Sequence, residues 1–260
     1  MKVGFIGLGN MASAMIRGIR RTQGDRAALL GYSPHREKKA GLAQECSLTI
    51  CGSNAEVADL CDVLVLAVKP QVVDSVLGEV ARADGKMVIS IVAGRALEAL
   101  TRAFPHSPVA RVMPNINARI GASITGVCVN DRFSPEQRET LTALLSGMGQ
   151  TQEIEEKFAG IFSCIGGATP AFTYTYLDAI AEAALREGMP KQMALRIAAQ
   201  SVLGCAQMLL ETTNHPLALA DQVCSPGGTT VEGIFALKKL GFEHAVHEAV
   251  CAVIEKDRRI

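Results

Sequence analysis

The chain has 260 residues, a length that suits one large domain or two modest ones. Apolar residues make up 48% and charged residues 20%, which is enough for a core and excludes a disordered or collagen-like chain. Basic and acidic residues both number 26, so the chain lacks the positive field that recruits a nucleic acid, and we expect no nucleic-acid partner.

The first half alternates short apolar runs with helical patterns. Strands are predicted at Val3–Ile6, Ala28–Tyr32, Asp62–Val68, Met87–Val92, Val109–Met113 and Ser123–Val129. Between them lie a helical pattern that ends near Arg21 and the further stretches Arg36–Cys46, Gln71–Ala81 and Ala96–Phe104. Ser134 with Pro135 opens another helix as N-cap and first-turn proline. This alternation predicts an α/β fold with a parallel sheet and right-handed crossovers.

The strand pattern stops after about Glu155. Helices rich in Ala, Leu and Met are predicted at Pro170–Glu187, Pro190–Leu210, Val231–Leu240 and Glu243–Lys256. We therefore divide the chain into an α/β domain at residues 1–154 and an all-helical domain at residues 155–260. The long helices can pack within one subunit or between two, and the sequence leaves both arrangements open.

A glycine-rich turn follows the first strand and opens the first helix. It reads G-x-G-x-x-A, in which the first glycine permits a tight turn and the second lets a pyrophosphate approach the backbone. The small third residue allows close packing of helix on strand, and the helix N-terminus favours the phosphates. The predicted cofactor-binding residues of this turn are Gly7, Leu8, Gly9, Asn10, Met11 and Ala12.

The end of the second strand bears on the choice of cofactor. NAD enzymes usually place Asp or Glu there to bind the ribose 2′-hydroxyl, but this chain has Ser33, His35 and Arg36. A hydroxyl and cationic donors suit a 2′-phosphate, which favours NADPH and leaves NADH as the second candidate. The alternative is that Arg36 lies on an exposed helix face without a ligand.

Two further strands are expected to end at the same edge of the sheet, where ligands bind in open α/β folds. Lys69 follows the strand at 62–68, and Pro70 starts the next helix. Lys69 is either a ligand of cofactor or substrate or a solvated charge at a strand end. Ala93 and Gly94 follow the next strand, where a nicotinamide ring would extend.

A second glycine-containing loop precedes a helix in the helical half. The segment runs from Ser225 through Gly227 and Gly228 to Thr229 and Thr230. Its backbone N–H groups, its hydroxyls and the helix N-terminus predict a carboxylate pocket, with an ordinary threonine-capped helix as the alternative. The loop holds no strong acid or base, so it suits reduction of an imine better than reduction of a carbonyl.

The remaining signals concern thiols, metals and membranes. The cysteines form no C-x-x-C pair and have no histidine at zinc spacing, so we expect buried thiols and no metal site. His244 and His247 lack a further ligand and are assigned to a helix surface. The longest apolar run, Val63–Val68, is far shorter than the roughly 20 residues that span a bilayer. No signal-peptide pattern precedes the first strand, so we expect a cytoplasmic protein without a membrane partner.

Five segments of the chain resemble the pyrroline-5-carboxylate reductase family. They are residues 5–12, 66–71, 89–94, 111–115 and 222–233, the last reading Gln-Val-Cys-Ser-Pro-Gly-Gly-Thr-Thr-Val-Glu-Gly. The resemblance implies a Rossmann-type doubly wound sheet followed by an all-α dimerisation domain. It also implies NAD(P)H-dependent reduction of Δ1-pyrroline-5-carboxylate to L-proline, in a homodimer or a ring of dimers.

The same resemblance implies roles for single residues. Ser33 and Arg36 would lie beside the adenosine ribose and its phosphate. The cofactor groove would be lined by Asn54, Ala67, Val68, Lys69 and Pro70. The substrate would be held by Ser225, Gly228, Thr229 and Thr230. The Thr230 hydroxyl matches the family's proposed proton donor; because it is a weak acid, we interpret it as an orienting group that relays a proton from water.

One segment departs from the family pattern. The family's Gly-Ser-Gly-Pro-Ala-Tyr stretch reads Gly-Ala-Thr-Pro-Ala-Phe at residues 167–172, so the serine and tyrosine hydroxyls are lost and a glycine becomes threonine. A cyclic imino acid with a six-membered or sulfur-containing ring is therefore an alternative substrate. A β-hydroxyacid dehydrogenase is disfavoured because residues 159–185 contain no lysine, and a non-catalytic NADP-binding regulator is the alternative outside enzymes.

Overall fold

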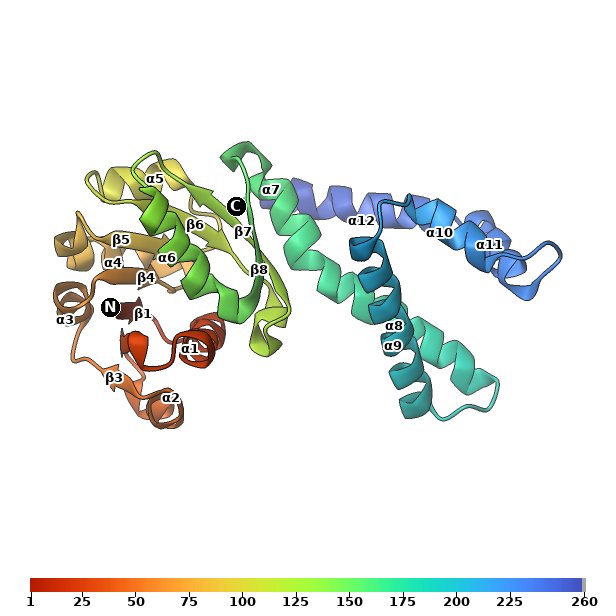
Figure 1. Ribbon diagram of the computed structural model, residues 1–260, viewed down its shortest axis with the longest axis horizontal. Helices are drawn as coiled ribbons and strands as arrows, with labels where there is room; N and C mark the ends of the chain where they lie inside the picture. Colours follow the sequence, from red (N-terminus) through yellow and green to blue (C-terminus); the bar gives the residue numbers. More distant parts are fainter. Residues whose placement is uncertain (259–260) are drawn as a thin grey trace. The chain divides into compact units, whose positions relative to one another are not determined.

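The chain forms two compact units (Figure 1). The computed structural model describes residues 1–258, with Arg36 described by its backbone only. The first unit comprises residues 1–170 with 257 and 258, and the second comprises residues 171–256. The first unit extends beyond residue 154 because Phe162 packs on the sheet: a Cβ at Gly126 would lie 2.6 Å from its ring.

An eight-stranded sheet forms the centre of the first unit, in the order β3-β2-β1-β4-β5-β6-β7-β8. The strands are β1 (Lys2–Ile6), β2 (Ala28–Tyr32), β3 (Leu48–Ile50), β4 (Val63–Leu66), β5 (Met87–Ser90), β6 (Val109–Met113), β7 (Ser123–Val129) and β8 (Gly149–Glu153). The order of the first six strands is that of a doubly wound dinucleotide-binding sheet. The predicted fold class is therefore confirmed.

One strand pairing differs from the predicted parallel sheet. The strands β6 and β7 are antiparallel, with Arg111 opposite Cys128, whereas all other neighbouring strands are parallel. Residues 114–122 connect β6 to β7 through a short 3₁₀ turn, Ile116–Ile120. A parallel crossover needs a dozen or more residues, so this connection is too short to return the chain to the other end of the sheet.

Helices cover both faces of this sheet (Figure 1). One face carries α1 (Asn10–Gln23), α2 (Ala40–Cys46) and α6 (Pro135–Leu145). The other face carries α3 (Asn54–Leu60), α4 (Val73–Val80) and α5 (Leu97–Ala103). As predicted, Ser134 caps α6: its hydroxyl accepts from the backbone N–H of Gln137, and the Gln137 side chain accepts in return from the N–H of Ser134. The short helix α7 (Ala159–Phe162) and a π-helical stretch, Ser163–Ala168, complete the unit.

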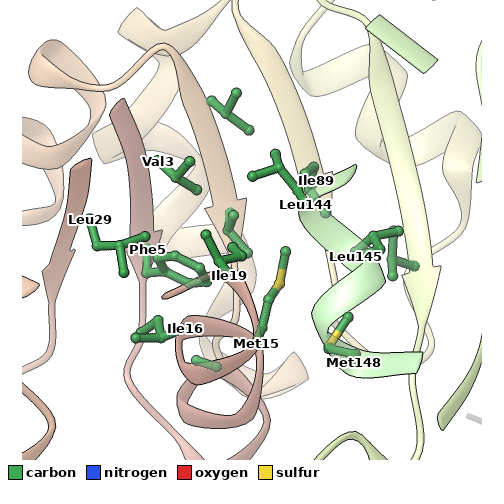
Figure 2. Packing of buried hydrophobic residues seen from close by; sticks show 14 of the residues in the cluster. Val3, Phe5, Met15, Ile16, Ile19, Leu29, Ile89, Leu144, Leu145 and Met148 are labelled. Atoms are coloured by element: carbon green, nitrogen blue, oxygen red, sulfur yellow. The ribbon is translucent and has the colours of Figure 1, made fainter. Parts of the chain in front are cut away.

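The core beneath α1 is built from alternate residues of the strands (Figure 2). Val3 and Phe5 of β1 point to the α1 side and meet Ile16 and Ile19, and all four side chains are fully buried. Burying an apolar side chain of this size stabilises a fold by about 1.5–3 kcal/mol relative to exposure. Since both faces of β1 are covered, its sequence is a continuous apolar run rather than an alternating one.

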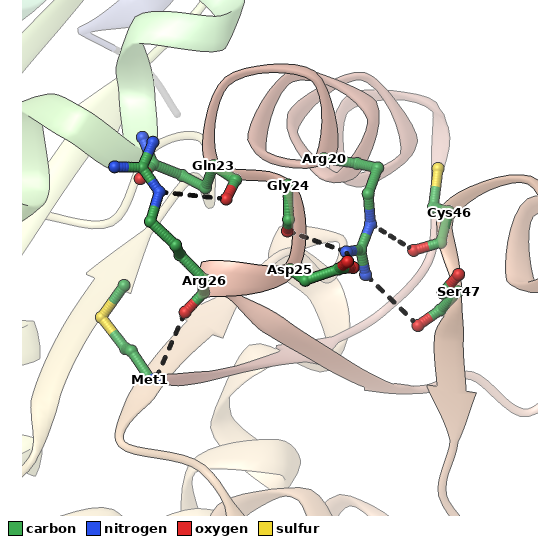
Figure 3. Close-up of polar contacts among 8 residues, drawn as sticks. All are labelled: Met1, Arg20, Gln23, Gly24, Asp25, Arg26, Cys46 and Ser47. Carbon is green, nitrogen blue, oxygen red and sulfur yellow. Dashed lines mark hydrogen bonds and ion pairs between the residues drawn. The ribbon is translucent and has the colours of Figure 1, made fainter.

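Polar contacts hold the carboxyl end of α1 in place (Figure 3). The Nε of Arg20 donates to the carbonyl oxygen of Cys46 at 2.8 Å, and its Nη1 donates to that of Gly24 at the same distance. The terminal amine of Met1 donates to the carbonyl oxygen of Arg26 at 3.4 Å. Because α1 is held at this end, its amino end and the glycine-rich turn have a defined position beyond β1.

The second unit is entirely helical. Its helices are α8 (Thr169–Arg186), α9 (Lys191–Glu211), α10 (Pro216–Val223), α11 (Thr229–Lys239) and α12 (Phe242–Asp257), of which only α10 was not predicted. Of the described residues 171–256, three are buried: Ala181, Ala194 and Ala198. Large apolar side chains that are exposed include Tyr174, Met193, Leu203, Met208, Leu210 and Phe235. A single copy of this unit therefore leaves its apolar surface uncovered.

The thiols differ between the two units. Five cysteines of the first unit are buried, as expected: Cys46, Cys51, Cys61, Cys128 and Cys164. The expectation is wrong for the second unit, where Cys205 is exposed and Cys224 and Cys251 are half-buried, because this unit has no large core of its own. His244 and His247 are exposed on α12, as predicted.

Candidate functional site

The glycine-rich turn lies between β1 and α1 and depends on Gly7. This residue has a φ of +90°, which L side chains rarely adopt. Its N–H donates to the carbonyl oxygen of Tyr32 at 2.9 Å, and an added Cβ would lie 2.7 Å from the carbonyl oxygen of Ala67. The turn is therefore packed between the ends of β2 and β4, and glycine is required at position 7.

The start of α1 is open on its outer side. Gly9 is the N-cap residue with no side-chain cap, and no atom lies within 4 Å of the point where its Cβ would be. Asn10 and Met11 form the exposed and half-buried beginning of the helix, while Leu8 and Ala12 are buried beneath it. The first backbone N–H groups of α1 thus face open space, which is the arrangement that binds phosphates.

The residues after β2 lie beside a basic cavity. Ser33 is half-buried directly after the strand, and Arg36 begins the 3₁₀ turn Arg36–Lys39; the side chain of Arg36 lies outside the described structure. A cavity of about 500 Å³ lies against the start of α1, and its lining includes Asn10, Ser13, Arg17, Lys38, Lys39 and Arg119. Four of these side chains are cationic, so this cavity suits an anionic group.

Further predicted groove residues lie after β3 and β4. Asn54 is the first residue of α3 and is buried, and its side-chain amide donates to the Glu79 carboxylate of α4 at 2.9 Å. Lys69 is exposed just before the 3₁₀ turn that leads into α4. The predicted residues that follow β4 are Ala67, Val68, Lys69 and Pro70. They share the sheet edge with the glycine-rich turn, since the N–H of Ala67 donates to the carbonyl oxygen of Ile6.

A second cavity, of about 300 Å³, lies at the ends of β5 and β6; we call it the strand-end cavity. Its lining includes Met11, Ala93, Gly94, Arg111, Met113 and Gly167. The structure therefore brings Met11 of the glycine-rich turn together with Ala93 and Gly94, as the sequence predicts. It also places Gly167, the first residue of the segment that departs from the family pattern, in the wall of this cavity.

Sequence reasoning missed most of the far wall of the strand-end cavity. This wall contains Phe162 and Ser163, and the side chain of Asn115 holds it to β6 by donating to the carbonyl oxygen of Gly166 at 2.7 Å. Arg111 lies in one of the segments that resemble the family, but the resemblance implies no role for it. A charged side chain in the apolar run Val109–Met113 is the signal that would have identified it.

Arg111 is held by a short ion pair. Its Nη1 lies 2.6 Å from Oε1 of Glu156, and the same oxygen accepts from the backbone N–H of Leu97 at 3.0 Å. Only 12% of the Arg111 side chain is exposed. Across the sheet, burial and the neighbouring Glu156 carboxylate raise the pKa of the Cys128 thiol to about 12, so this thiol is neutral near pH 7.

The predicted substrate loop lies in the second unit and forms a tight turn. The N–H of Gly228 donates to the carbonyl oxygen of Ser225 at 3.0 Å, and Gly227 has a φ of +70°. An added Cβ at Gly228 would meet the Ser225 hydroxyl, so a side chain there requires that hydroxyl to move, while the backbone conformation of Gly227 favours glycine.

The helix α11 begins with Thr229 and Thr230, and its N-cap is Gly228 without a side-chain cap. The N-cap is therefore a glycine and not a threonine. Both threonines are exposed in the first turn of α11, beside backbone N–H groups that have no side-chain cap. Hydroxyls and free amides together can hold a carboxylate.

Comparison with known proteins decides the family. The pyrroline-5-carboxylate reductase of Escherichia coli (strain K12) is 37% identical over 100% of this chain and 98% of its own length. The chain belongs to the pyrroline-5-carboxylate reductase family. Residues 156–260 of the chain match the family described as "Pyrroline-5-carboxylate reductase dimerisation". Residues 2–94 match the family described as "NADP oxidoreductase coenzyme F420-dependent".

Solved structures agree with this assignment. The Plasmodium falciparum pyrroline carboxylate reductase with NADP bound superposes with a TM-score of 0.89 at 29% identity and covers 100% of this chain and 97% of that one. The 1-pyrroline-5-carboxylate reductase of Streptococcus pyogenes superposes with a TM-score of 0.88 at 33% identity and covers 100% of this chain and 99% of that one. The reductase described here therefore has the fold of this family along its whole length.

Proposed function

We propose that the chain reduces the C=N bond of Δ1-pyrroline-5-carboxylate to form L-proline, with NADPH as the hydride donor. The observation that carries the proposal is the continuity of the glycine-rich turn with the strand-end cavity, since Met11 belongs to both. The cofactor supplies the hydride, and the protein binds, orients and excludes water. The membership in a family of NADP-dependent reductases supports the same activity.

The residues of the first unit fit a dinucleotide along the sheet edge. The open N–H groups after Gly9 would bind the pyrophosphate. Ser33 and Arg36 would bind the adenosine ribose and its 2′-phosphate, with Lys69 close to the groove. The cations around the 500 Å³ cavity support NADPH over NADH, because a 2′-phosphate adds negative charge at this end. The nicotinamide ring of the cofactor would extend toward Ala93 and Gly94.

The substrate loop would hold the carboxylate of the imino acid. Ser225 and Gly228 would bind it through the turn, and Thr229 and Thr230 through their hydroxyls and N–H groups. The Thr230 hydroxyl would orient the ring nitrogen and relay a proton from water as the hydride arrives on the neighbouring carbon. The strand-end cavity, which belongs to the first unit, has the volume to hold the nicotinamide ring.

We further propose a cytoplasmic homodimer, or a ring of such dimers, built by residues 155–260, with residues 1–154 as the cofactor domain. The match to a dimerisation family over residues 156–260 supports the association. So does an apolar cavity of about 790 Å³ between α9 and α10 within one chain. The helix α9 has the length and the mean hydropathy, 1.4, of a helix that could cross a membrane. Only 11% of that stretch is buried within one chain, so most of this apolar helix is left exposed. A second subunit would cover it.

The experiment is a substrate panel. Purified protein is mixed with NADPH and either pyrroline-5-carboxylate or the piperideine carboxylates, and NADPH consumption is followed by absorbance. We expect the highest kcat/KM with pyrroline-5-carboxylate. A higher value with a six-membered ring would move the substrate assignment to the larger ring. Binding of NADPH without consumption on any cyclic imino acid would favour the regulator.

A further inference from the structure

The cation that lines the strand-end cavity belongs to an ion pair to which the proposed reaction assigns no role. Arg111 is the middle residue of β6 and lines this cavity, and Glu156 begins the 3₁₀ turn that precedes α7. Their side chains are 12% and 34% exposed, and the nitrogen and oxygen are 2.6 Å apart. A partly buried charge pair interacts more strongly than a fully exposed one, and it acts on any charge placed beside it.

Glu156 is the partner that balances the charge of Arg111. Nε of Arg111 and Oε2 of Glu156 are both buried without a hydrogen-bond partner among the described residues. The other groups that act on the Glu156 carboxylate, the N–H of Leu97 and the thiol of Cys128, are uncharged. Cys128 lies opposite Arg111 on the neighbouring strand β7, but its thiol is neutral near pH 7, since its pKa is raised to about 12. The nearby Arg95 is held by Asp74 at 2.6 Å.

The position of the pair relates it to the cofactor ring. Among the described residues that line the strand-end cavity, Arg111 is the one cation and Asp257 the one anion. Glu156 also accepts from the N–H of Leu97, the first residue of α5, and so holds the end of the loop that follows β5 and contains Ala93 and Gly94. Ala93 and Gly94 line the same cavity.

We propose that Glu156 is a positioning residue that neutralises Arg111, so that the strand-end cavity accepts the nicotinamide ring in both of its charge states. The inference rests on the proposed function. The oxidised ring carries a positive charge and the reduced ring carries none. A guanidinium without its carboxylate would repel the oxidised ring and leave the reduced ring almost unaffected. The product cofactor would then bind poorly, although the substrate cofactor binds normally.

The test measures the dissociation constants of NADP⁺ and NADPH by titration at pH 8. Glu156→Gln removes the charge, but its amide oxygen can still accept from Leu97 and Arg111. We expect its Kd for NADP⁺ to rise about tenfold, while the Kd for NADPH stays within about twofold. Arg111→Met leaves the Glu156 carboxylate without its cationic partner, and this negative charge should shift the ratio of the two dissociation constants in the opposite direction. The double variant should return the ratio close to that of the wild type.

Glu153→Gln is the matched control. Glu153 lies on β8 of the same sheet and pairs with Arg138 at 2.5 Å, but neither residue lines the strand-end cavity. Its ratio of dissociation constants should not change. An unchanged ratio in Glu156→Gln, or equal weakening of both cofactor forms, would overturn the inference. If Glu156→Gln does not fold, the shift in Arg111→Met decides the question. Failure of the wild type to bind either form would instead refute the proposed function.

Discussion

The carbonyl oxygen of Ala67 lies 2.7 Å from the point that a Cβ on Gly7 would occupy. The turn after β1 is thus packed against the end of β4, and the positive φ of Gly7 adds a second reason for glycine. We predict that Gly7→Ala lowers the free energy of unfolding by about 2–4 kcal/mol, because both the clash and the backbone strain must be relieved. Urea denaturation measures this change, and a loss below about 0.5 kcal/mol would contradict it.

Gly9 should behave differently, although it lies two residues away. No atom lies within 4 Å of its added Cβ, so the side chain of Gly9→Val would enter open space. We predict that NADPH binding is abolished, because the side chain blocks the approach of the pyrophosphate, while the free energy of unfolding falls by only about 1 kcal/mol. Titration with NADPH and urea denaturation of the same sample separate the two effects. Normal NADPH affinity would show that the pyrophosphate does not lie on this turn.

Thr230 is the residue to which we assign proton relay. We predict that Thr230→Ala lowers kcat about 10²-fold, because the hydroxyl that orients the ring nitrogen is lost. Thr230→Ser keeps the hydroxyl and should keep most of the activity. Thr230 is exposed in the first turn of α11, so the thermal unfolding midpoint of both variants should stay near that of the wild type. Unchanged turnover in Thr230→Ala would remove the role.

Arg36 is expected to distinguish NADPH from NADH. We predict that Arg36→Ala raises the Kd for NADPH about tenfold and that for NADH less than twofold, because only NADPH carries the 2′-phosphate. Arg82→Ala is the control. Arg82 is exposed and pairs with Asp59 at 2.8 Å. It precedes β5 and so lies at the amino ends of the strands, whereas Ser33 and Arg36 follow the carboxyl end of β2. Equal weakening of both cofactors by Arg36→Ala would show that Arg36 does not recognise the phosphate.

The fold could be predicted where the sequence pattern is strong. Continuous apolar runs such as the one in β4 identify strands that are buried on both faces. The edge strands β3 and β8 were missed because β3 has three residues and β8 reads Gly-Gln-Thr-Gln-Glu, with no apolar residue to mark it. The strand β7 was predicted, but its antiparallel direction was missed, because the direction depends on the length of a connection and not on the strand itself.

Within the candidate site, the glycine-rich turn could be predicted because a local sequence pattern marks it. The spacing of Gly7 and Gly9 is a weak signal alone, but its place between a buried strand and a helix predicts a dinucleotide-binding turn. Arg111 and Glu156 come from segments 45 residues apart that only the folded sheet brings together. No local pattern in either segment indicates the other, so their pairing required the structure.

The apolar surface of the second unit predicts its own association. Met208 lies on α9, is 54% exposed in one chain, and lines the apolar cavity between α9 and α10. We predict that the wild type sediments as a dimer or larger assembly, and that Met208→Glu shifts it toward monomer, because a buried carboxylate without a partner is strongly unfavourable. Gln152→Glu on β8 is the control and should leave the sedimentation unchanged. A monomeric wild type would contradict the proposed assembly.

The most direct test of the account follows the hydride itself. Pyrroline-5-carboxylate is incubated with the protein and NADPH that carries deuterium at the transferable position of the nicotinamide ring, and the product is analysed by mass spectrometry and NMR. The account predicts proline with one deuterium on the carbon that belonged to the C=N bond. Proline without deuterium, or no proline while the labelled NADPH remains bound and unchanged, would contradict it.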